Sequence, residues 1–458
     1  MPVVRRLPVV KDLTLVTTGA MTANVAGYLL QLLASRWLGV SGYSSFASLL
    51  AVQMLCAVPA LALQNVVARE VVRGAPVRAA RELTARCAGL VAVVALVLVP
   101  VVGAVLKVGV AASAGALCSA PALVLLAGEQ GILQGRSRFR ELATVLGGAA
   151  IVRVTPALTV LACGFGSAPA LWAGAGGATL AAIAARRIAD RALTGHGREA
   201  DAMLPNDSDG NTSGSPAWSS PAVTEEVPAV APLPGADSGS AAPRRTAALG
   251  LGVAAVFRAV QVQAALTALS AADLLVSRII LDENDAGRYA LGAIAAKIAF
   301  WLPQAVGVVL YPKMAQPQHS VRAVRSALAV LVGIGAVTVL GAAVAAPLAP
   351  LFAGRDYAPI EGLLWLFALE GALLAVLQAA LLSAIAADRT APAAITWVGL
   401  GVGIAVMLTC AHSVLSLIII ATATAALTTL VITGLALRGA RDETENPTRV
   451  PELGPNGT

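Results

Sequence analysis

Apolar runs long enough to cross a lipid bilayer repeat along almost the whole of this chain, and no other feature constrains its fold as strongly. A membrane-spanning helix needs about 20 consecutive apolar residues. Runs of that length alternate here with short hinges that carry arginine. Of the 458 residues, 57% are hydrophobic and 12% are charged, with a mean hydropathy of +0.79. A soluble protein of this length carries about twice that charged fraction. The sequence therefore predicts a membrane protein.

The apolar runs predict an all-α fold with about twelve membrane-spanning helices in two sets of six. The first set is expected at residues 13–35, 43–66, 86–107, 113–133, 142–163 and 167–188. The second set is expected at residues 249–276, 287–310, 323–346, 360–385, 391–411 and 414–437. The stretch from Ala327 to Phe352 is longer than one span needs, and we expect Pro347 and Pro350 to end that helix.

Lysine and arginine are distributed unevenly between the hinges. When the N-terminus is placed inside, 24 of the 32 lysine and arginine residues fall in inner loops or tails. The outer loops hold Arg36, Lys107, Arg278, Arg288 and Arg355. Basic residues accumulate in cytoplasmic loops, so we expect both termini in the cytoplasm. The same bias explains the net charge of +7 without nucleic acid as a partner, because the basic residues form no stripe.

The composition changes sharply between the two sets of helices. Residues 190–246 are rich in Pro, Gly, Ser, Ala and Asp and lack apolar periodicity, which predicts a disordered cytoplasmic linker. The linker separates an N-terminal six-helix bundle (1–189) from a C-terminal six-helix bundle (247–440), and residues 441–458 form a second disordered tail. With six helices in each half, the halves are expected to be parallel repeats around a central cavity.

Four ionisable residues lie near the middle of the expected spans, about 15 Å from a helix end. Arg153, Arg258 and Lys297 are cations, Glu370 is a carboxylate, and Asp273 lies nearer the outer end of the seventh span. Charges inside spans usually face a cavity or a partner. The cationic surplus favours an anionic substrate, because guanidinium forks onto phosphate oxygens. The structural alternative is that Glu370 neutralises one cation and another reaches an interface.

Other polar residues in the spans have two interpretations each. Candidates for the cavity lining in the first two helices are Asn24, Gln31, Gln53 and Gln64, with hydrogen bonds between helices as the alternative role. Glu129, near the inner end of the fourth span, is expected to pair with the arginines between positions 136 and 140. The glycines from Gly174 to Gly177 indicate close helix packing.

No pattern in the sequence indicates catalysis, a metal or a cofactor. His196, His319 and His412 stand apart from any nucleophile or carboxylate pair. The five cysteines occur singly, without a CxxC pair, and the chain has no GxxxxGK(S/T) nucleotide-binding loop. We therefore expect a transporter rather than an enzyme. A membrane glycosyltransferase would need a sizeable outer loop, and an inactive scaffold is permitted but not suggested by the linker.

Several groups of residues resemble landmarks of one family. They are Ala34 to Gly39 followed by Gly42-Tyr43 and Phe46, Gly131 to Gly135 with Phe139, Asp273 to Arg278 followed by Ala286 to Ala290, Leu310-Tyr311-Pro312, and Gly354 to Tyr357. In order and spacing they resemble the polysaccharide flippases of the multidrug/oligosaccharidyl-lipid/polysaccharide (MOP) exporter superfamily. The long linker departs from the family pattern. The first span also lacks the carboxylate that many drug-exporting relatives place there.

The resemblance implies two six-helix bundles arranged in a V, as in MATE transporters. It implies a Wzx-like flippase in the bacterial cytoplasmic membrane that moves a polyprenyl-diphosphate-linked oligosaccharide by alternating access. Arg153, Arg258 and Lys297 would hold the diphosphate while the lipid tail stays among membrane lipids. Glu370 and Asp273 are candidates for ion coupling. Glycosyltransferases or a glycan polymerase would be partners. The alternative is a cation-coupled multidrug exporter of the same fold, which predicts a cavity dominated by carboxylates.

Overall fold

All regular structure in the described part of the chain is helical. The computed structural model describes residues 7–202, 243–314, 320–386 and 391–445, with side chains described for 14–194, 261, 263–301, 328–381, 394–435 and 437. The long helices are α1 (Leu7–Val72), α2 (Val77–Val105), α3 (Val110–Gly135), α4 (Phe139–Ala162), α5 (Ser167–Ala202), α6 (Pro243–Ile280), α7 (Glu283–Met314), α8 (Ser320–Ala345), α10 (Leu364–Ala386), α11 (Ala391–Cys410) and α12 (Val414–Glu445). Since a kink divides α1 into two spans, these helices provide twelve spans, and the predicted fold class is confirmed.

The first two spans meet at Gly39 without an intervening loop. Gly39 has φ 68° and ψ 179°, a backbone region that is essentially restricted to glycine. The sequence predicted a connection from residue 35 to residue 43, whereas the reversal is made by this one residue. The two parts of α1, residues 7–38 and 40–72, therefore form a hairpin, and we call this turn the Gly39 hinge.

The helices form two halves with the same internal pairing. In the N-terminal half (α1–α5), α3 packs against α1, α2 and α5, and α4 packs against α1 and α5. In the C-terminal half (α6–α12), α10 packs against α7, α8 and α12, and α11 packs against α6 and α12. The two sets of contacts correspond helix by helix when the two parts of α1 are matched to α6 and α7. The repeat that the sequence suggested is therefore present in the packing.

Glycine allows a close helix crossing in corresponding helices of the two halves. A Cβ at Gly131 of α3 would lie 2.6 Å from the carbonyl oxygen of Gln64, and one at Gly371 of α10 would meet the carbonyl oxygen of Ala296 in α7. Both contacts are closer than a side chain allows, so α3 and α10 each need glycine where they cross the helix that follows the first span of their half.

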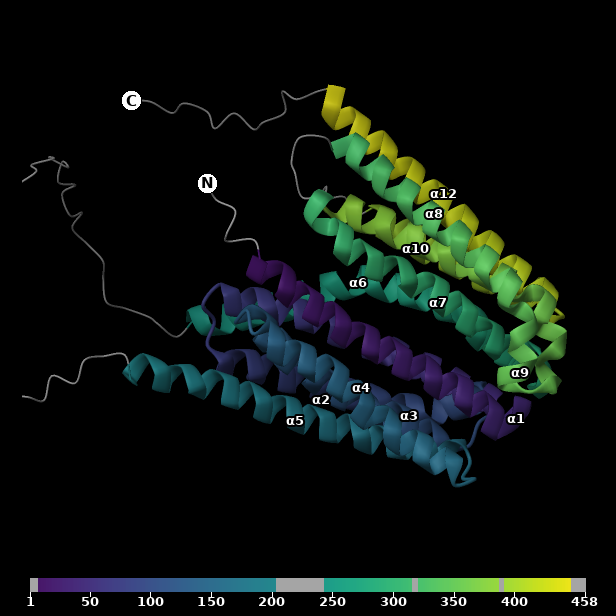
Figure 1. Ribbon diagram of the computed structural model, residues 1–458, viewed down its shortest axis with the longest axis horizontal. Coiled ribbons are helices and arrows are strands. Elements are labelled where there is room, and N and C mark those ends of the chain that lie inside the picture. Colours follow the sequence, from purple (N-terminus) through teal and green to yellow (C-terminus); the bar gives the residue numbers. More distant parts are fainter. Residues whose placement is uncertain (1–6, 203–242, 315–319, 387–390, 446–458) are drawn as a thin grey trace, which may run out of the picture.

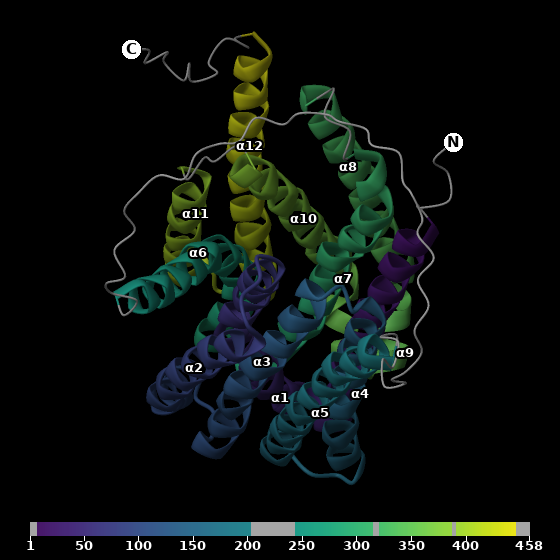
Figure 2. The same cartoon turned by 90° about the vertical axis from the view of Figure 1, so that its left-hand side faces the viewer.

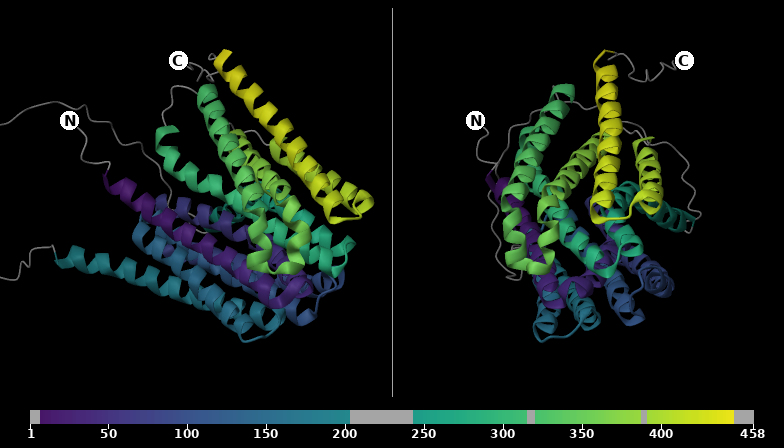
Figure 3. Two further views of the ribbon diagram at one scale, coloured as in Figure 1. Left: turned by 45° about the vertical axis from the view of Figure 1, so that its right-hand side comes forward. Right: turned by 90° about the vertical axis from the view of Figure 1, so that its right-hand side faces the viewer.

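The two halves meet along α1, which contacts α6 and α7 across the interface. Figure 1 shows the halves converging at the end that contains the Gly39 hinge and α9 (Ala349–Ala353) and diverging toward the end with the marked termini. We call these the hinge end and the termini end. Figure 2, viewed from the termini end, separates α2–α5 from α8, α10 and α12, and both views in Figure 3 agree. The hinge end is the predicted outer side.

The connection between α8 and α10 has no counterpart in the N-terminal half. It consists of η1 (Ala346–Leu348), α9 and η2 (Arg355–Leu363), and we call it the 346–363 insertion. Pro347 lies in η1 and Pro350 lies in α9, so the long apolar run ends as a spanning helix where the two prolines predicted. Proline cannot donate a backbone hydrogen bond and blocks continuation of the preceding helix.

Three helices extend into segments that were expected to be disordered. α5 reaches Ala202 and α6 begins at Pro243, so both extend into the interval 190–246 that was expected to be a linker, and α12 reaches Glu445. Once a helix has nucleated, each added residue contributes a hydrogen bond, so Ala- and Arg-containing flanks readily extend it. The predicted disorder at 203–242 and 446–458 concerns residues outside those that the structure describes.

We predict that Gly39→Ala destabilises the protein. The Cβ would have room, because no atom lies within 4 Å of it, but φ 68° with ψ 179° would remain strained. Such strain costs about 1–3 kcal/mol. Gly89→Ala in α2 is the matched control, since its Cβ also has free space and alanine favours a helix interior by about 0.5–1 kcal/mol. Thermal unfolding in detergent should show a lower midpoint for Gly39→Ala alone, and equal midpoints would contradict the assigned strain.

Candidate functional site

A cavity of about 380 Å³ lies between the two halves. Its wall is formed by α1, α3, α4 and α5 from the N-terminal half and by α6, α7 and α10 from the C-terminal half. The volume falls within the range of small-molecule sites, about 300–1,000 Å³. Because the wall is divided between the halves, a movement of one half relative to the other changes both its shape and its access.

The four polar residues predicted from α1 all lie on the cavity wall. Asn24 and Gln31 come from the first part of α1, and Gln53 and Gln64 from the second. Asn24 and Gln31 are seven residues apart, which places them on one face of a helix, and Tyr28 between them also lines the cavity. Gln64 donates a hydrogen bond to Gln134 Oε1 at 3.2 Å, so it also has the alternative role of bonding between helices.

Two of the three predicted cations reach the cavity from opposite halves. Arg153 projects from α4 and Lys297 from α7, and both are half-buried. Among the described side chains Arg153 has no hydrogen bond or ion pair. Lys297 Nζ has one long contact, 3.5 Å, to Gln31 Oε1. The side chain of Arg258 lies outside the described part of the chain.

Close helix packing holds Arg153 in place. A Cβ at Gly177 of α5 would lie 2.5 Å from the carbonyl oxygen of Val152 and 2.8 Å from the Cα of Arg153. The sequence predicted that the glycines at 174–177 serve packing, and the structure confirms this for Gly177, whereas a Cβ at Gly176 would meet nothing within 4 Å. Because Gly177 has no side chain, the backbone of α5 packs directly against the turn of α4 that carries the Arg153 guanidinium.

Two buried carboxylates complete the ionisable lining. Asp273 of α6 and Glu370 of α10 are each 3% exposed and line the cavity. Tyr289 donates a hydrogen bond to Asp273 Oδ2 at 2.8 Å, whereas Asp273 Oδ1 and Glu370 Oε2 have no partner among the described residues. Asp273 interacts electrostatically with both Lys297 and Glu370.

The described lining is therefore mixed in charge rather than cationic throughout. Arg153 is the one charged lining residue described in the N-terminal half, while Lys297, Asp273 and Glu370 share the C-terminal half. The sequence placed Asp273 toward the outer end of its span, and in the structure this residue joins the cavity. A phosphate-sized anion would find an unpaired guanidinium on one wall, and a proton or cation would find two carboxylates on the other.

Sequence reasoning missed further polar lining residues. They are Gln130 of α3 and Gln263, Thr267 and Ser270 of α6. The three residues of α6 follow a spacing of four and three, which places them on one helical face. This polar face of α6 could have been predicted from the spacing in the sequence. Gln130 had a similar signal, because Gln134 follows it by four residues on the same face of α3 and bonds to Gln64.

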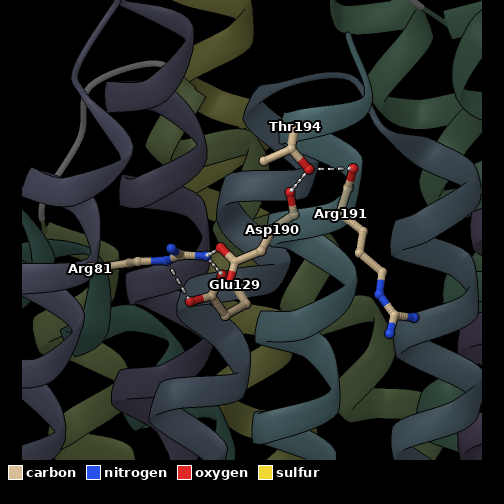
Figure 4. Close-up of polar contacts among 5 residues, drawn as sticks. All are labelled: Arg81, Glu129, Asp190, Arg191 and Thr194. Atoms are coloured by element: carbon tan, nitrogen blue, oxygen red, sulfur yellow. Dashed lines mark hydrogen bonds and ion pairs between the residues drawn. The ribbon is translucent and has the colours of Figure 1, made fainter. Parts of the chain in front are cut away.

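Glu129 belongs to an ion cluster at the termini end of the N-terminal half. Arg81 of α2 donates from Nε and Nη2 to the two carboxylate oxygens of Glu129 at 2.9 and 3.0 Å, and from Nη2 to Asp190 Oδ1 of α5 at 2.6 Å. In Figure 4 the guanidinium of Arg81 faces both carboxylates, and Thr194 is bonded to the backbone of Asp190 and Arg191.

The cluster corrects two expectations. Glu129 pairs with Arg81 rather than with the arginines at 136–140, because α2 packs against this part of α3. Asp190, expected to begin the linker, lies in α5 and joins three helices of the N-terminal half. The cluster also fixes the helical turn that carries Gln130 into the cavity.

We predict that Glu129→Gln lowers stability by about 1.5–3 kcal/mol, because it removes charge-assisted hydrogen bonds from a half-buried guanidinium. The matched control is Glu82→Gln, which removes an exposed pair with Arg78 on the same helix as Arg81. Such surface pairs contribute about 0.3–0.5 kcal/mol. Thermal unfolding of both variants in one detergent provides the measurement. A control as destabilised as Glu129→Gln would show that the cluster has no special role.

Within the described residues no group of three or more His, Cys, Asp and Glu side chains is arranged to hold a metal ion. Nine described helical segments are long and apolar enough to cross a membrane, and the first of them contains both spans of α1.

No family model matches the chain, and no curated protein sequence matches it. Solved structures do match along nearly the whole length. An inward-facing multidrug-resistance MATE family transporter of the MOP superfamily is 13% identical, covers 94% of this chain and 96% of its own, and has a TM-score of 0.57. A mutant of the Vibrio cholerae MATE transporter VcmN is 16% identical, with 94% and 97% covered and the same TM-score of 0.57. A MATE protein in complex with MaL6 is 12% identical, with 95% and 97% covered and a TM-score of 0.50.

At these identities the likeness concerns the fold. The agreement covers both six-helix halves and the order in which they follow one another. The chain is a multi-pass membrane protein with the fold of the MATE transporters of the MOP superfamily.

Proposed function

We propose that this protein is a transporter that flips a polyprenyl-diphosphate-linked oligosaccharide across the bacterial cytoplasmic membrane by alternating access. The headgroup would enter the cavity from the termini end while its lipid tail stays in the bilayer. Glycosyltransferases that build the glycan and a polymerase that extends it are the proposed partners. The fold of two halves around one cavity supports the transport step.

The observation that supports the anionic substrate is the unpaired guanidinium of Arg153. A buried charge without a partner is unfavourable in a membrane protein unless it faces water or a ligand. Arg153 lies on the cavity wall, and its planar group suits two phosphate oxygens at once. Lys297 faces it from the other half with one long contact, so a diphosphate between them would contact both halves.

The membrane potential favours export of such a headgroup. One elementary charge moved across the membrane corresponds to about 2.3 kcal/mol per 100 mV. With the termini in the cytoplasm, as the loop charges predict, a negative headgroup leaves a negative compartment. Asp273 and Glu370 are the candidates for any additional ion coupling.

The cavity of about 380 Å³ is smaller than an oligosaccharide of several sugars. We propose that it holds the diphosphate and the first sugar, while the remaining sugars extend toward the termini end. In Figure 1 the two halves diverge in that direction.

We predict that Arg153→Ala and Lys297→Ala each reduce flipping at least tenfold. Hydrogen bonds to charged groups contribute about 1.5–3 kcal/mol, and 1.4 kcal/mol corresponds to a factor of ten. The measurement is exposure of a fluorescent polyprenyl-diphosphate disaccharide to an impermeant glycosidase, in vesicles containing the purified protein. Arg258→Ala is expected to act in the same direction. Arg187→Ala, which changes an exposed arginine of α5 that does not line the cavity, is the control and should leave the rate unchanged. Normal rates in all three variants, Arg153→Ala, Lys297→Ala and Arg258→Ala, would refute the anion site.

The second candidate function, a cation-coupled multidrug exporter, is supported by Asp273 and Glu370. Both are buried on the cavity wall, and each has a carboxylate oxygen without a partner among the described residues. Carboxylates of this kind suit a proton, a metal cation or a cationic drug. The solved neighbours include a multidrug-resistance transporter, which agrees with this alternative at the level of fold.

Neutralising the carboxylates separates the two candidates. If the protein flips an anionic headgroup driven by the potential, Asp273→Asn and Glu370→Gln should leave flipping within a few-fold of wild type, because neither carboxylate would contact the diphosphate. A drug exporter should instead lose export of a cationic dye in both variants. Dye efflux and glycan flipping are measured on the same vesicle preparations. Loss of dye efflux together with an absence of flipping would favour the exporter.

A further inference from the structure

Arg278 lies in the last turn of α6 at the hinge end and is buried, with 6% of the residue exposed. The sequence counted it among outer-loop cations, yet the structure places its guanidinium inside the protein. It donates from Nε to Leu106 O at 3.0 Å, from Nη1 to Ser44 Oγ at 3.1 Å, and from Nη2 to Lys107 O at 3.4 Å and Glu283 Oε1 at 3.0 Å.

Three of these four acceptors belong to the other half of the molecule. Leu106 and Lys107 follow the end of α2, and Ser44 lies just beyond the Gly39 hinge. The last carbonyls of a helix have no donor within that helix and carry the negative end of its dipole. Arg278 thus caps α2 across the interface between the halves. Glu283, the first residue of α7 across the short turn, is the one acceptor from its own half.

Neutral contacts surround this capping interaction at the hinge end. Tyr357 of the 346–363 insertion donates to Ser35 O at 3.2 Å, and Gly287 of α7 lies against the carbonyl oxygen of Val40. Arg36 has only long contacts, 3.4 and 3.5 Å, to the carbonyl oxygens of Leu351 and Phe352, and its side chain is exposed. Among the described side chains Arg278 is therefore the buried charge that joins the two halves at this end.

We infer that Arg278 is the latch of the hinge-end gate, which holds the halves together in this conformation and must release α2 before the cavity opens on that side. Separation of the halves removes three of its four acceptors at once, so the closed state is favoured until water can replace them. The inference rests on the alternating-access part of the proposed function and not on the identity of the substrate.

The test measures access to the cavity from each face of the membrane. A reporter, Leu50→Cys on the cavity wall, is placed in a chain whose five native cysteines are changed to serine. An impermeant maleimide is added to either face of vesicles without any substrate. Arg278→Gln should raise the labelling rate from the hinge-end face at least tenfold and lower it from the termini-end face.

Two further variants make the result specific. Arg288→Gln is the matched control, because Arg288 also lies at the hinge end but donates only within its own half, to Asp356 O at 3.1 Å and Asp285 Oδ1 at 2.9 Å. It should label like the parent. Ser44→Ala removes one acceptor from the N-terminal half while leaving Arg278 in place, and it should shift labelling in the same direction as Arg278→Gln by a smaller factor.

The latch is refuted if neither Arg278→Gln nor Ser44→Ala changes labelling, or if Arg288→Gln changes it as much as Arg278→Gln. Should Arg278→Gln fail to fold, Ser44→Ala decides the question by itself. Because the assay contains no glycan, a shift in labelling together with an absence of flipping would retain the latch and reject only the substrate.

Discussion

The high free energy of a charge inside a lipid bilayer determines how this protein is arranged. The buried and cavity-lining charges in the described spans have one of three environments: a partner, as in the Arg81 cluster, main-chain carbonyls, as for Arg278, or the cavity wall. Arg153 has only the last of these. The guanidinium of Arg153 therefore requires the cavity beside it. The proposed role of the cavity in transport follows from the same constraint.

The two halves use one architecture with different chemistry. Their helices pair in the same order, and glycine allows a close crossing in the corresponding helices α3 and α10. The ionisable lining is not repeated, since the N-terminal half contributes a guanidinium and the C-terminal half an amine and two carboxylates. Positions where helices pack closely tolerate few residue types, so the repeat persists at these positions. Residues on the cavity wall can be substituted more freely, and such substitutions can give each half a different role.

Much of the fold could be predicted from the sequence because hydropathy and helix length are local properties. The number of spans, the prolines after α8 and the polar face of α1 all depend on residues close together in the chain. Partners across helices do not. Glu129 was assigned to nearby arginines, but its partner Arg81 lies on another helix. From the sequence, Arg278 was assigned to an outer loop, because nothing local indicates that α2 ends beside it in the structure. Asp273 was placed by depth along its span, which says nothing about which neighbouring helices surround it.

The 346–363 insertion has a consequence for molecules that bind from the hinge-end side. The other described connections at that end are short, from the Gly39 hinge to residues 411–413 before α12. The insertion is therefore the longest connection at that end among the described residues. It touches α1 in one half and α7 and α10 in the other. An antibody or small protein that binds this segment would fix the two halves relative to each other. It would act as a conformational inhibitor without entering the cavity.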